Sequence, residues 1–149
     1  MQGKRSQLGR RRRVVCAAFL IVLVSCSADA RTPSGTRVDV TLKDFSIRTS
    51  TPTAAAGRVS FEVENRGPAT HEFVVVRTDL PDDGLPIAAD GLSVDEEALA
   101  GVGEISDVKL STSDTLDLNL APGHYVFFCN LEGHYLGGMS GALLVSDDA

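Results

Sequence analysis

Short segments in which apolar and polar residues alternate recur along most of this chain. Residues 38–42, 59–63 and 116–120 each place an apolar side chain at every second position. This two-residue period is typical of β-strands with one buried and one solvated face. Three further apolar runs complete the set, at residues 71–76, 125–129 and 141–146. Turn-forming residues separate the segments, so the pattern predicts an all-β domain, either an antiparallel sandwich or a barrel.

One long stretch, residues 77–110, interrupts the strand pattern and is strongly acidic. It contains nine acidic residues and only two basic ones, Arg77 and Lys109. Ser93 and the acids after it resemble a helix start, and Gly101 would end that helix. We therefore expect a surface excursion with one short helix. A solvated loop is the preferred interpretation of the acidic run, and a docking patch for a basic partner is the alternative.

The N-terminus has the features of an export signal. Six of the basic residues precede position 14, and residues 14–24 are an uninterrupted apolar run of 11 residues. This run is shorter than the roughly 20 residues that span a membrane, and it fits the apolar part of a signal peptide. Residues 23–26 (LVSC) resemble the bacterial lipobox, which predicts cleavage before Cys26 and lipid attachment to its thiol. An ordinary signal peptide in which Cys26 has no role is the alternative.

The predicted organisation is a signal peptide (1–25), a lipid-anchored flexible tether (26–36) and one domain (37–147). The domain would lie on the outer face of the cell membrane, on the periplasmic or extracellular side, and the arginine run leaves the export route open between the general and the twin-arginine pathways. After cleavage, 8 basic and 20 acidic residues leave a net charge of −12, which excludes nucleic acid as a partner. Cys129 is then the one thiol that is neither removed nor lipidated, so no disulfide can form within the domain.

Three metal-binding residue types occur close together near the C-terminus. Cys129, His134 and Met139 are spaced Cys-x4-His-x4-Met, and Met139 is the only Met left after cleavage. A thiolate, an imidazole and a thioether are soft ligands that favour copper, and His71 is the candidate for a fourth ligand. The structural alternatives are a buried core histidine at position 71 and core packing of Met139. Alternation along 125–129 places His124 on the face opposite Cys129, so we interpret it as a surface turn residue.

These residues and segments resemble the cupredoxins, the type 1 blue copper proteins, over residues 38–146. The loop spacing is most similar to the rusticyanin and sulfocyanin type. The resemblance implies a Greek-key β-sandwich with one copper ion held by His71, Cys129, His134 and Met139. It implies a short bond from Cys129 and a long axial one from Met139. A backbone carbonyl near Ala69 or Thr70 remains an alternative axial ligand.

Two positions depart from the family pattern. Many members have Asn after the first His ligand, where this chain has Glu72. The Glu72 backbone N–H can still donate to the Cys129 sulfur, and Asn130 is expected to tie the two ligand loops together. Leu131, Tyr135 and Leu136 are expected to form an apolar rim around His134 where redox partners dock, the alternative being that they cap the core.

The resemblance implies a membrane-tethered carrier of single electrons. We expect a monomer with redox proteins as partners and no enzymatic activity. A subunit of a multi-copper oxidoreductase is one alternative, but it needs more His ligands than this chain has. A copper storage or delivery protein, and a metal-free sandwich for adhesion or ligand binding, are the others.

Overall fold

The computed structural model describes residues 35–148. The predicted signal peptide, the lipidation residue Cys26 and nearly all of the predicted tether lie outside the described residues. Within the described part, no helix has the length and apolar character needed to cross a membrane.

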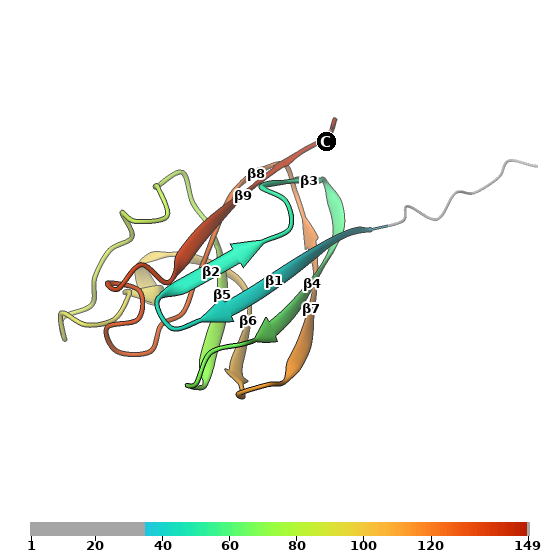
Figure 1. The fold of residues 1–149 in the computed structure, drawn as a ribbon. Coiled ribbons are helices and arrows are strands. Elements are labelled where there is room, and N and C mark those ends of the chain that lie inside the picture. The colour runs from blue at the N-terminus through green and yellow to red at the C-terminus, as the bar shows by residue number, and fades with distance from the viewer. Residues whose placement is uncertain (1–34, 149) are drawn as a thin grey trace, which may run out of the picture. The chain divides into compact units, whose positions relative to one another are not determined.

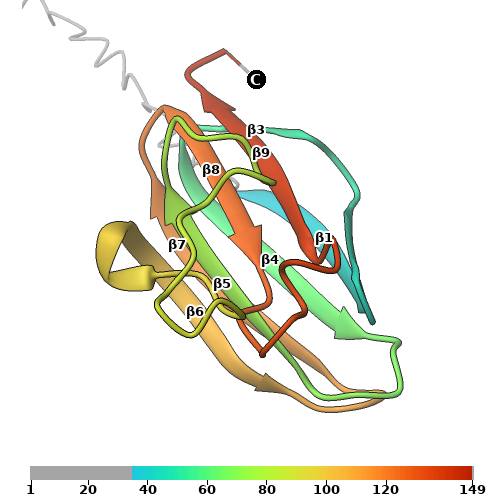
Figure 2. The ribbon, with the colours of Figure 1, turned by 90° about the vertical axis from the view of Figure 1, so that its left-hand side faces the viewer.

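The described chain folds into two packed β-sheets (Figures 1 and 2). The first sheet has the order β2-β1-β4-β7, formed by β1 (Thr36–Lys43), β2 (Ser46–Thr49), β4 (Gly57–Asn65) and β7 (Ser113–Leu120). The second has the order β3-β9-β8-β5-β6, formed by β3 (Thr53–Ala55), β5 (His71–Arg77), β6 (Ala100–Val108), β8 (Gly123–Phe128) and β9 (Ser140–Ser146). Most neighbours are antiparallel, but β1 pairs with β4 and β3 with β9 in parallel. The predicted β-sandwich is confirmed, and its sheets are mixed rather than purely antiparallel.

The main core lies between the two sheets and follows the predicted alternation. In β1 and β4 the buried side chains occupy every second position, as the pattern of residues 38–42 and 59–63 requires. Phe73 of β5 and Phe127 of β8 join this core from the opposite sheet, with ring centroids 5.6 Å apart. Apolar burial of this kind provides most of the driving force for folding.

The acidic excursion covers the outer face of the second sheet, which corrects its interpretation as a purely solvated loop. Leu85 and Val94 are buried there against Val74, Val76 and neighbouring side chains of β8. Because both faces of β5 and β8 are covered, their sequences are continuous apolar runs rather than alternating ones. Val126 and Phe128 face this second cluster while Tyr125 and Phe127 face the main core, as the alternation along β8 predicts.

The expected short helix is one 3-10 turn, Glu96–Ala98, and the chain after it forms a strand. This strand, β6, was not predicted. It is an edge strand in which Val108 alone is buried, so its sequence lacks the apolar alternation of a packed strand. Backbone pairing with β5 holds it in the sheet, with register shifts at two points along the ladder.

Four connections meet at one end of the sandwich. The parallel strands β1 and β4 both end there. Strand β5 begins there, and its antiparallel partner β8 ends there. The turn between β1 and β2 (residues 44–45), the β4–β5 loop (66–70), the β6–β7 turn (109–112) and the β8–β9 loop (129–139) are therefore neighbours. In Figure 2 strand β8 runs down into the loop that leads to β9. We refer to this end as the site pole.

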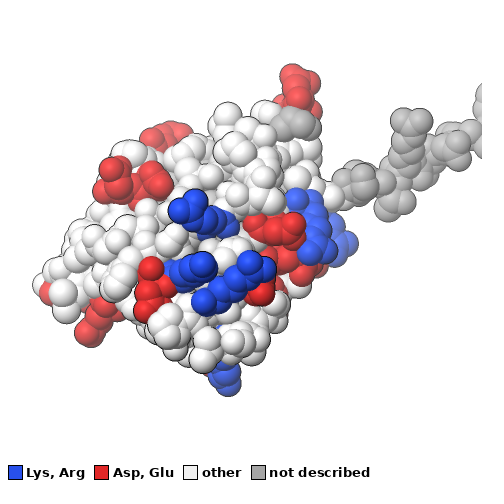
Figure 3. Space-filling model, viewed as in Figure 1, with Lys and Arg blue, Asp and Glu red and all other residues white. Residues whose placement is uncertain are grey.

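The outer face of the first sheet is polar and carries charges of both signs. Figure 3 shows Lys and Arg interspersed with Asp and Glu over this face. Ion pairs join Arg37 to Asp39 and Arg58 to Asp117. All four side chains are largely exposed, so each pair contributes little to stability.

Candidate metal centre

The β8–β9 loop is closed on itself by backbone hydrogen bonds. Met139 accepts from the N–H of Cys129 (3.1 Å) and donates its own N–H to the carbonyl of His134 (3.0 Å). His134 in turn donates to Leu131 (2.9 Å), and Gly137 donates to Gly133 (2.9 Å). Gly133 has φ 78°, a left-handed conformation that favours glycine. These hydrogen bonds fix the backbone from which the side chains of Cys129, His134 and Met139 project.

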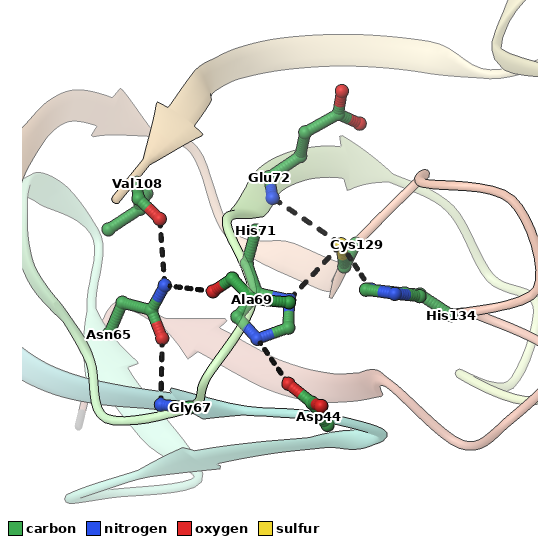
Figure 4. Close-up of polar contacts among 9 residues, drawn as sticks. All are labelled: Asp44, Asn65, Gly67, Ala69, His71, Glu72, Val108, Cys129 and His134. Atoms are coloured by element: carbon green, nitrogen blue, oxygen red, sulfur yellow. Dashed lines mark hydrogen bonds and ion pairs between the residues drawn. The ribbon is translucent and has the colours of Figure 1, made fainter. Parts of the chain in front are cut away.

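A fully buried asparagine at the end of β4 holds the loop that leads to His71 (Figure 4). Asn65 donates to the carbonyls of Ala69 (2.7 Å) and Val108 (2.8 Å) and accepts from the N–H of Gly67 (2.8 Å). These bonds define the path of the chain just before His71, whose own side chain is completely buried. A buried side chain with all its groups satisfied gives a loop one defined conformation.

The structure brings His71, Cys129 and His134 together around one point. Their three candidate ligand atoms all lie within 4.8 Å of one another. The Cys129 sulfur is 3.9 Å from Nδ1 of His71 and 3.4 Å from Nδ1 of His134. The two imidazole rings are 5.2 Å apart between centroids. A thiol and two imidazole nitrogens facing one another form a donor set suited to copper.

Met139 is completely buried and belongs to the main core together with Cys129. Its backbone is hydrogen-bonded to the backbones of both Cys129 and His134, and these two bonds define its position in the loop. Core packing and axial ligation are compatible for such a side chain, because the thioether is apolar and only a weak ligand.

Burial controls the protonation of the buried members of this cluster. It raises the pKa of the Cys129 thiol, an effect that N–H groups of Glu72 and Leu131 oppose. Burial also lowers the pKa of His71, the neighbouring His134 lowers it further, and Asp44 offsets part of this shift. Both changes favour neutral groups. A bound cation would displace the thiol proton and use the free nitrogen of each ring.

Glu72 and Asn130 both contact the cluster or its loop, in different ways. The Glu72 N–H donates to the Cys129 sulfur at 3.3 Å, the bond that was expected from sequence. The Asn130 side chain does not tie the two ligand loops together. It exchanges hydrogen bonds with the backbone of Val94, accepting at 2.7 Å and donating at 3.2 Å, and donates to Glu96 at 2.6 Å. Asn130 thus fastens the β8–β9 loop to the acidic excursion.

Tyr135 does not belong to an exposed rim, which corrects the expected docking surface. It is buried against Phe128, and its hydroxyl accepts the backbone N–H of Leu85 at 2.8 Å. Leu131 is partly buried against the main core. Leu136 alone of the three is exposed. The alternative that these residues cap the core therefore holds for Tyr135 and, in part, for Leu131.

Two residues of the β1–β2 turn, not predicted from sequence, complete the surroundings of the cluster. The Asp44 carboxylate lies 3.1 Å from Nε2 of His71. Phe45 stacks edge-on against His134, with centroids 5.6 Å apart, and lies over Gly137, where any Cβ would collide with its ring. Phe45 has φ 59°, which aromatic residues seldom adopt. Nothing in the local sequence signals these contacts, because an Asp in a tight turn is commonplace.

The third histidine lies away from the cluster. His124 is near the start of β8, whereas the cluster follows the end of that strand. Its Nδ1 lies 2.7 Å from the carbonyl of Thr78. His124 therefore lies outside the cluster, as predicted, but it is a partly buried residue of β8 rather than a surface turn residue.

Comparisons with known proteins point to one family. A family model described as a cupredoxin-like domain matches residues 15–145. An auracyanin from Roseiflexus castenholzii is similar in structure, with 19% identity, a TM-score of 0.53, and coverage of 74% of this chain and 97% of that one. Rusticyanin from Thiobacillus ferrooxidans has 19% identity, a TM-score of 0.53, and coverage of 76% and 79%.

Auracyanin A from Chloroflexus aurantiacus, described as a "blue" copper protein, has 18% identity and a TM-score of 0.50, and the match covers 74% of this chain and 98% of that one. No curated protein sequence matches this chain at a significant level.

Proposed function

The chain belongs to the cupredoxin-like family, and on that premise we propose that it binds one copper ion and carries single electrons. His71, Cys129, His134 and Met139 would hold the ion. One structural relative is described as a blue copper protein, and the auracyanin from Roseiflexus was crystallised in a reduced form. These descriptions support a redox role for the shared fold.

The observation that carries the proposal is the convergence of one thiol and two imidazole nitrogens within 4.8 Å of one another. Copper would supply reversible one-electron chemistry between Cu(I) and Cu(II), which prefer different geometries. The chain's contribution is to keep its ligands still. The hydrogen-bonded β8–β9 loop and the Asn65 network fix the ligand backbones, so little rearrangement accompanies each electron transfer.

A carrier is favoured over the alternatives by the placement of the ligands. A multi-copper oxidoreductase needs a further site built largely from His, and His124 is directed to the Thr78 carbonyl. A storage or delivery protein needs ligands that a partner can reach, whereas His71, Cys129 and Met139 are all completely buried. An electron, unlike an ion, can leave a buried site through a ligand ring.

We propose that redox partners dock beside His134, the one histidine of the cluster that is only partly buried. Phe45 packs edge-on against its ring and Leu136 follows it by two positions in the chain, and these two side chains are 54% and 53% exposed. A small apolar surface of this kind suits brief contacts with another redox protein. The chain would act there as a monomer.

We also propose that the domain is anchored by lipid on Cys26 to the outer face of the cell membrane. The support is the basic cluster, the apolar run and the LVSC sequence before the domain. Metabolic labelling with a fatty acid, together with membrane fractionation, tests this placement, and an unlabelled chain in the soluble fraction would contradict it.

Loading with Cu(II) tests the copper site directly. The wild-type chain is expected to show an intense thiolate-to-copper charge-transfer band that disappears on addition of ascorbate. The Cys129→Ser variant should lack the band, because a hydroxyl cannot replace the thiolate as electron donor. His124→Gln is the matched control and should keep it. A wild-type chain that binds no stoichiometric copper would overturn the proposal.

A further inference from the structure

We propose that Asp44 is a positioning residue for His71: its carboxylate holds the ring through Nε2–H, directs Nδ1 toward Cys129 and strengthens His71 as a copper ligand. This inference rests on the proposed function, because it concerns the same site. Figure 4 shows Asp44 on one side of the His71 ring and Cys129 on the other.

The two facing atoms are shielded from solvent, although the Asp44 side chain as a whole is 37% exposed. Nε2 of His71 and Oδ1 of Asp44 are both buried, and among the described residues neither has another hydrogen-bonding partner. They lie 3.1 Å apart. This distance is within hydrogen-bonding range, but the N–H direction is not aligned with Oδ1 in this structure. A buried donor and a buried acceptor each cost free energy when unpaired, so a hydrogen bond between these two atoms would remove both costs.

The backbone leaves room for this contact at one glycine. A Cβ on Gly67 would lie 2.9 Å from Nε2 of His71 and 3.0 Å from Oδ1 of Asp44. The first distance is too short for a carbon atom, and the second would require the carboxylate to move by a few tenths of an ångström. Gly67 is itself held by its hydrogen bond to Asn65, so it cannot easily move aside. Because Gly67 has no side chain, the Asp44 carboxylate and the His71 ring can approach each other beside it.

Asp44 is also fixed in position by the fold. It directly follows β1, which pairs in parallel with β4, and β4 leads into the loop before His71. The N–H of Arg66 donates to the carbonyl of Leu42 at 2.9 Å and ties that loop to the end of β1. The carboxylate and the ring thus come from two segments held together by backbone hydrogen bonds rather than from a flexible side chain reaching across.

The chemistry of the pair follows from the state of the ring. A neutral imidazole has one N–H donor and one acceptor nitrogen, and a carboxylate can only accept. Pairing Nε2–H with Asp44 leaves the lone pair on Nδ1, the atom 3.9 Å from the Cys129 sulfur. A carboxylate acceptor also makes the imidazole a stronger donor to a metal. Because Cu(II) gains more than Cu(I) from a stronger nitrogen donor, Asp44 should lower the midpoint potential.

A graded set of variants tests this assignment in the full-length chain purified in detergent. Asp44→Asn keeps an oxygen acceptor of nearly the same shape without the charge, and Asp44→Ala removes the acceptor. Glu132→Gln is the matched control, because it removes one charge from an exposed side chain in the β8–β9 loop. Thermal unfolding of each metal-free variant shows whether it is folded.

The first measurement is the ¹⁵N-resolved NMR signal of His71 in the metal-free chain. The wild type should show a slowly exchanging Nε2–H proton, which Asp44→Asn retains and Asp44→Ala loses. An unchanged signal in Asp44→Ala would overturn the contact. This measurement needs no copper, so it gives a result even if the proposed function is wrong.

The second measurement is copper affinity by competition with chelators. Asp44→Ala should weaken Cu(II) binding about 10–100-fold, Asp44→Asn by less, and Glu132→Gln by less than either. Cu(I) binding should change less, so the potential rises in the order Asp, Asn, Ala. If the blue site forms but its copper affinity and potential are the same in Asp44→Ala and Glu132→Gln, the inference about Asp44 is overturned and the proposed function stands. Absence of the blue band in the wild type would instead overturn the proposed function.

Discussion

At the scale of single residues, the cluster could be found from sequence because its members are rare. Cys129 and Met139 are the one Cys and the one Met of the described residues, and only three His occur in the chain. The structure brings His71, Cys129 and His134 together at one point. Asp44 and Phe45 could not be found in this way. They are ordinary turn residues in sequence, and only the pairing of β1 with β4 brings their turn beside the cluster.

Met139 has a place both in the core and beside the cluster, and a substitution can separate the two roles. Met139→Leu conserves volume and apolar character, so the unfolding free energy of the metal-free chain should change by less than about 1.5 kcal/mol. The midpoint potential of the copper-loaded chain should rise, because Cu(II) would lose a weak axial donor. Urea denaturation and a redox titration measure the two effects. An unchanged potential would favour a backbone carbonyl near Ala69 or Thr70 as the axial ligand.

At the scale of elements, strands with apolar alternation or a continuous apolar run were predictable, and strands held mainly by backbone pairing were not. The strands β1, β4, β5, β7, β8 and β9 correspond to segments with apolar alternation or a continuous apolar run. The short strands β2 and β3 and the strand β6 contain few buried apolar side chains. Their position depends on backbone pairing with a neighbour, which leaves no periodic pattern in the sequence.

For the acidic excursion, the prediction and the structure differ more than for the other elements. Its charges predict a solvated segment, and most of its side chains are indeed exposed. In the part before β6, its buried apolar residues are Leu85 and Val94, which are too far apart in sequence to form a pattern. They nevertheless cover the second sheet and bring the excursion against the β8–β9 loop, where Tyr135 and Asn130 bind its backbone.

The contact between Tyr135 and Leu85 gives a test of this covering role. Tyr135→Phe leaves the buried N–H of Leu85 without a partner, which should lower the free energy of unfolding by about 1–3 kcal/mol. Tyr125→Phe is the matched control: its hydroxyl donates to the carbonyl of Ala121, an exposed residue where water can replace it. Urea denaturation of the metal-free chains compares them. Equal losses in the two variants would contradict a specific role for the Tyr135 contact.

At the scale of the whole molecule, polar and apolar surface are distributed unequally. The outer face of the first sheet carries paired charges of both signs. The site pole instead exposes Phe45 and Leu136 next to His134. A partner that must come close to the cluster therefore meets apolar surface there.

A charge placed on that surface should hinder docking without disturbing the ligands. Leu136→Lys is expected to slow electron exchange with a redox partner, because a buried lysine ammonium in the contact is costly to desolvate. Leu144→Lys is the matched control: Leu144 is 52% exposed, nearly the same as Leu136, but lies in β9 opposite His124. Copper content should equal that of the wild type in both. Stopped-flow kinetics measure the exchange, and equal slowing in both variants would contradict docking at this pole.

The close approach of Gly67 to Asp44 and His71 has a consequence for how such sequences can diverge. The buried Nε2–H of His71 faces the carboxylate of Asp44, and any Cβ at position 67 would lie 2.9 Å from that nitrogen. This collision is with the His71 ring itself, so loss of the acid at position 44 would not make room for a side chain at position 67. Position 67 can accept a side chain only where the histidine is lost or moved. We therefore expect glycine at 67 and histidine at 71 to be lost together, which an alignment of relatives of this chain would reveal as paired substitution.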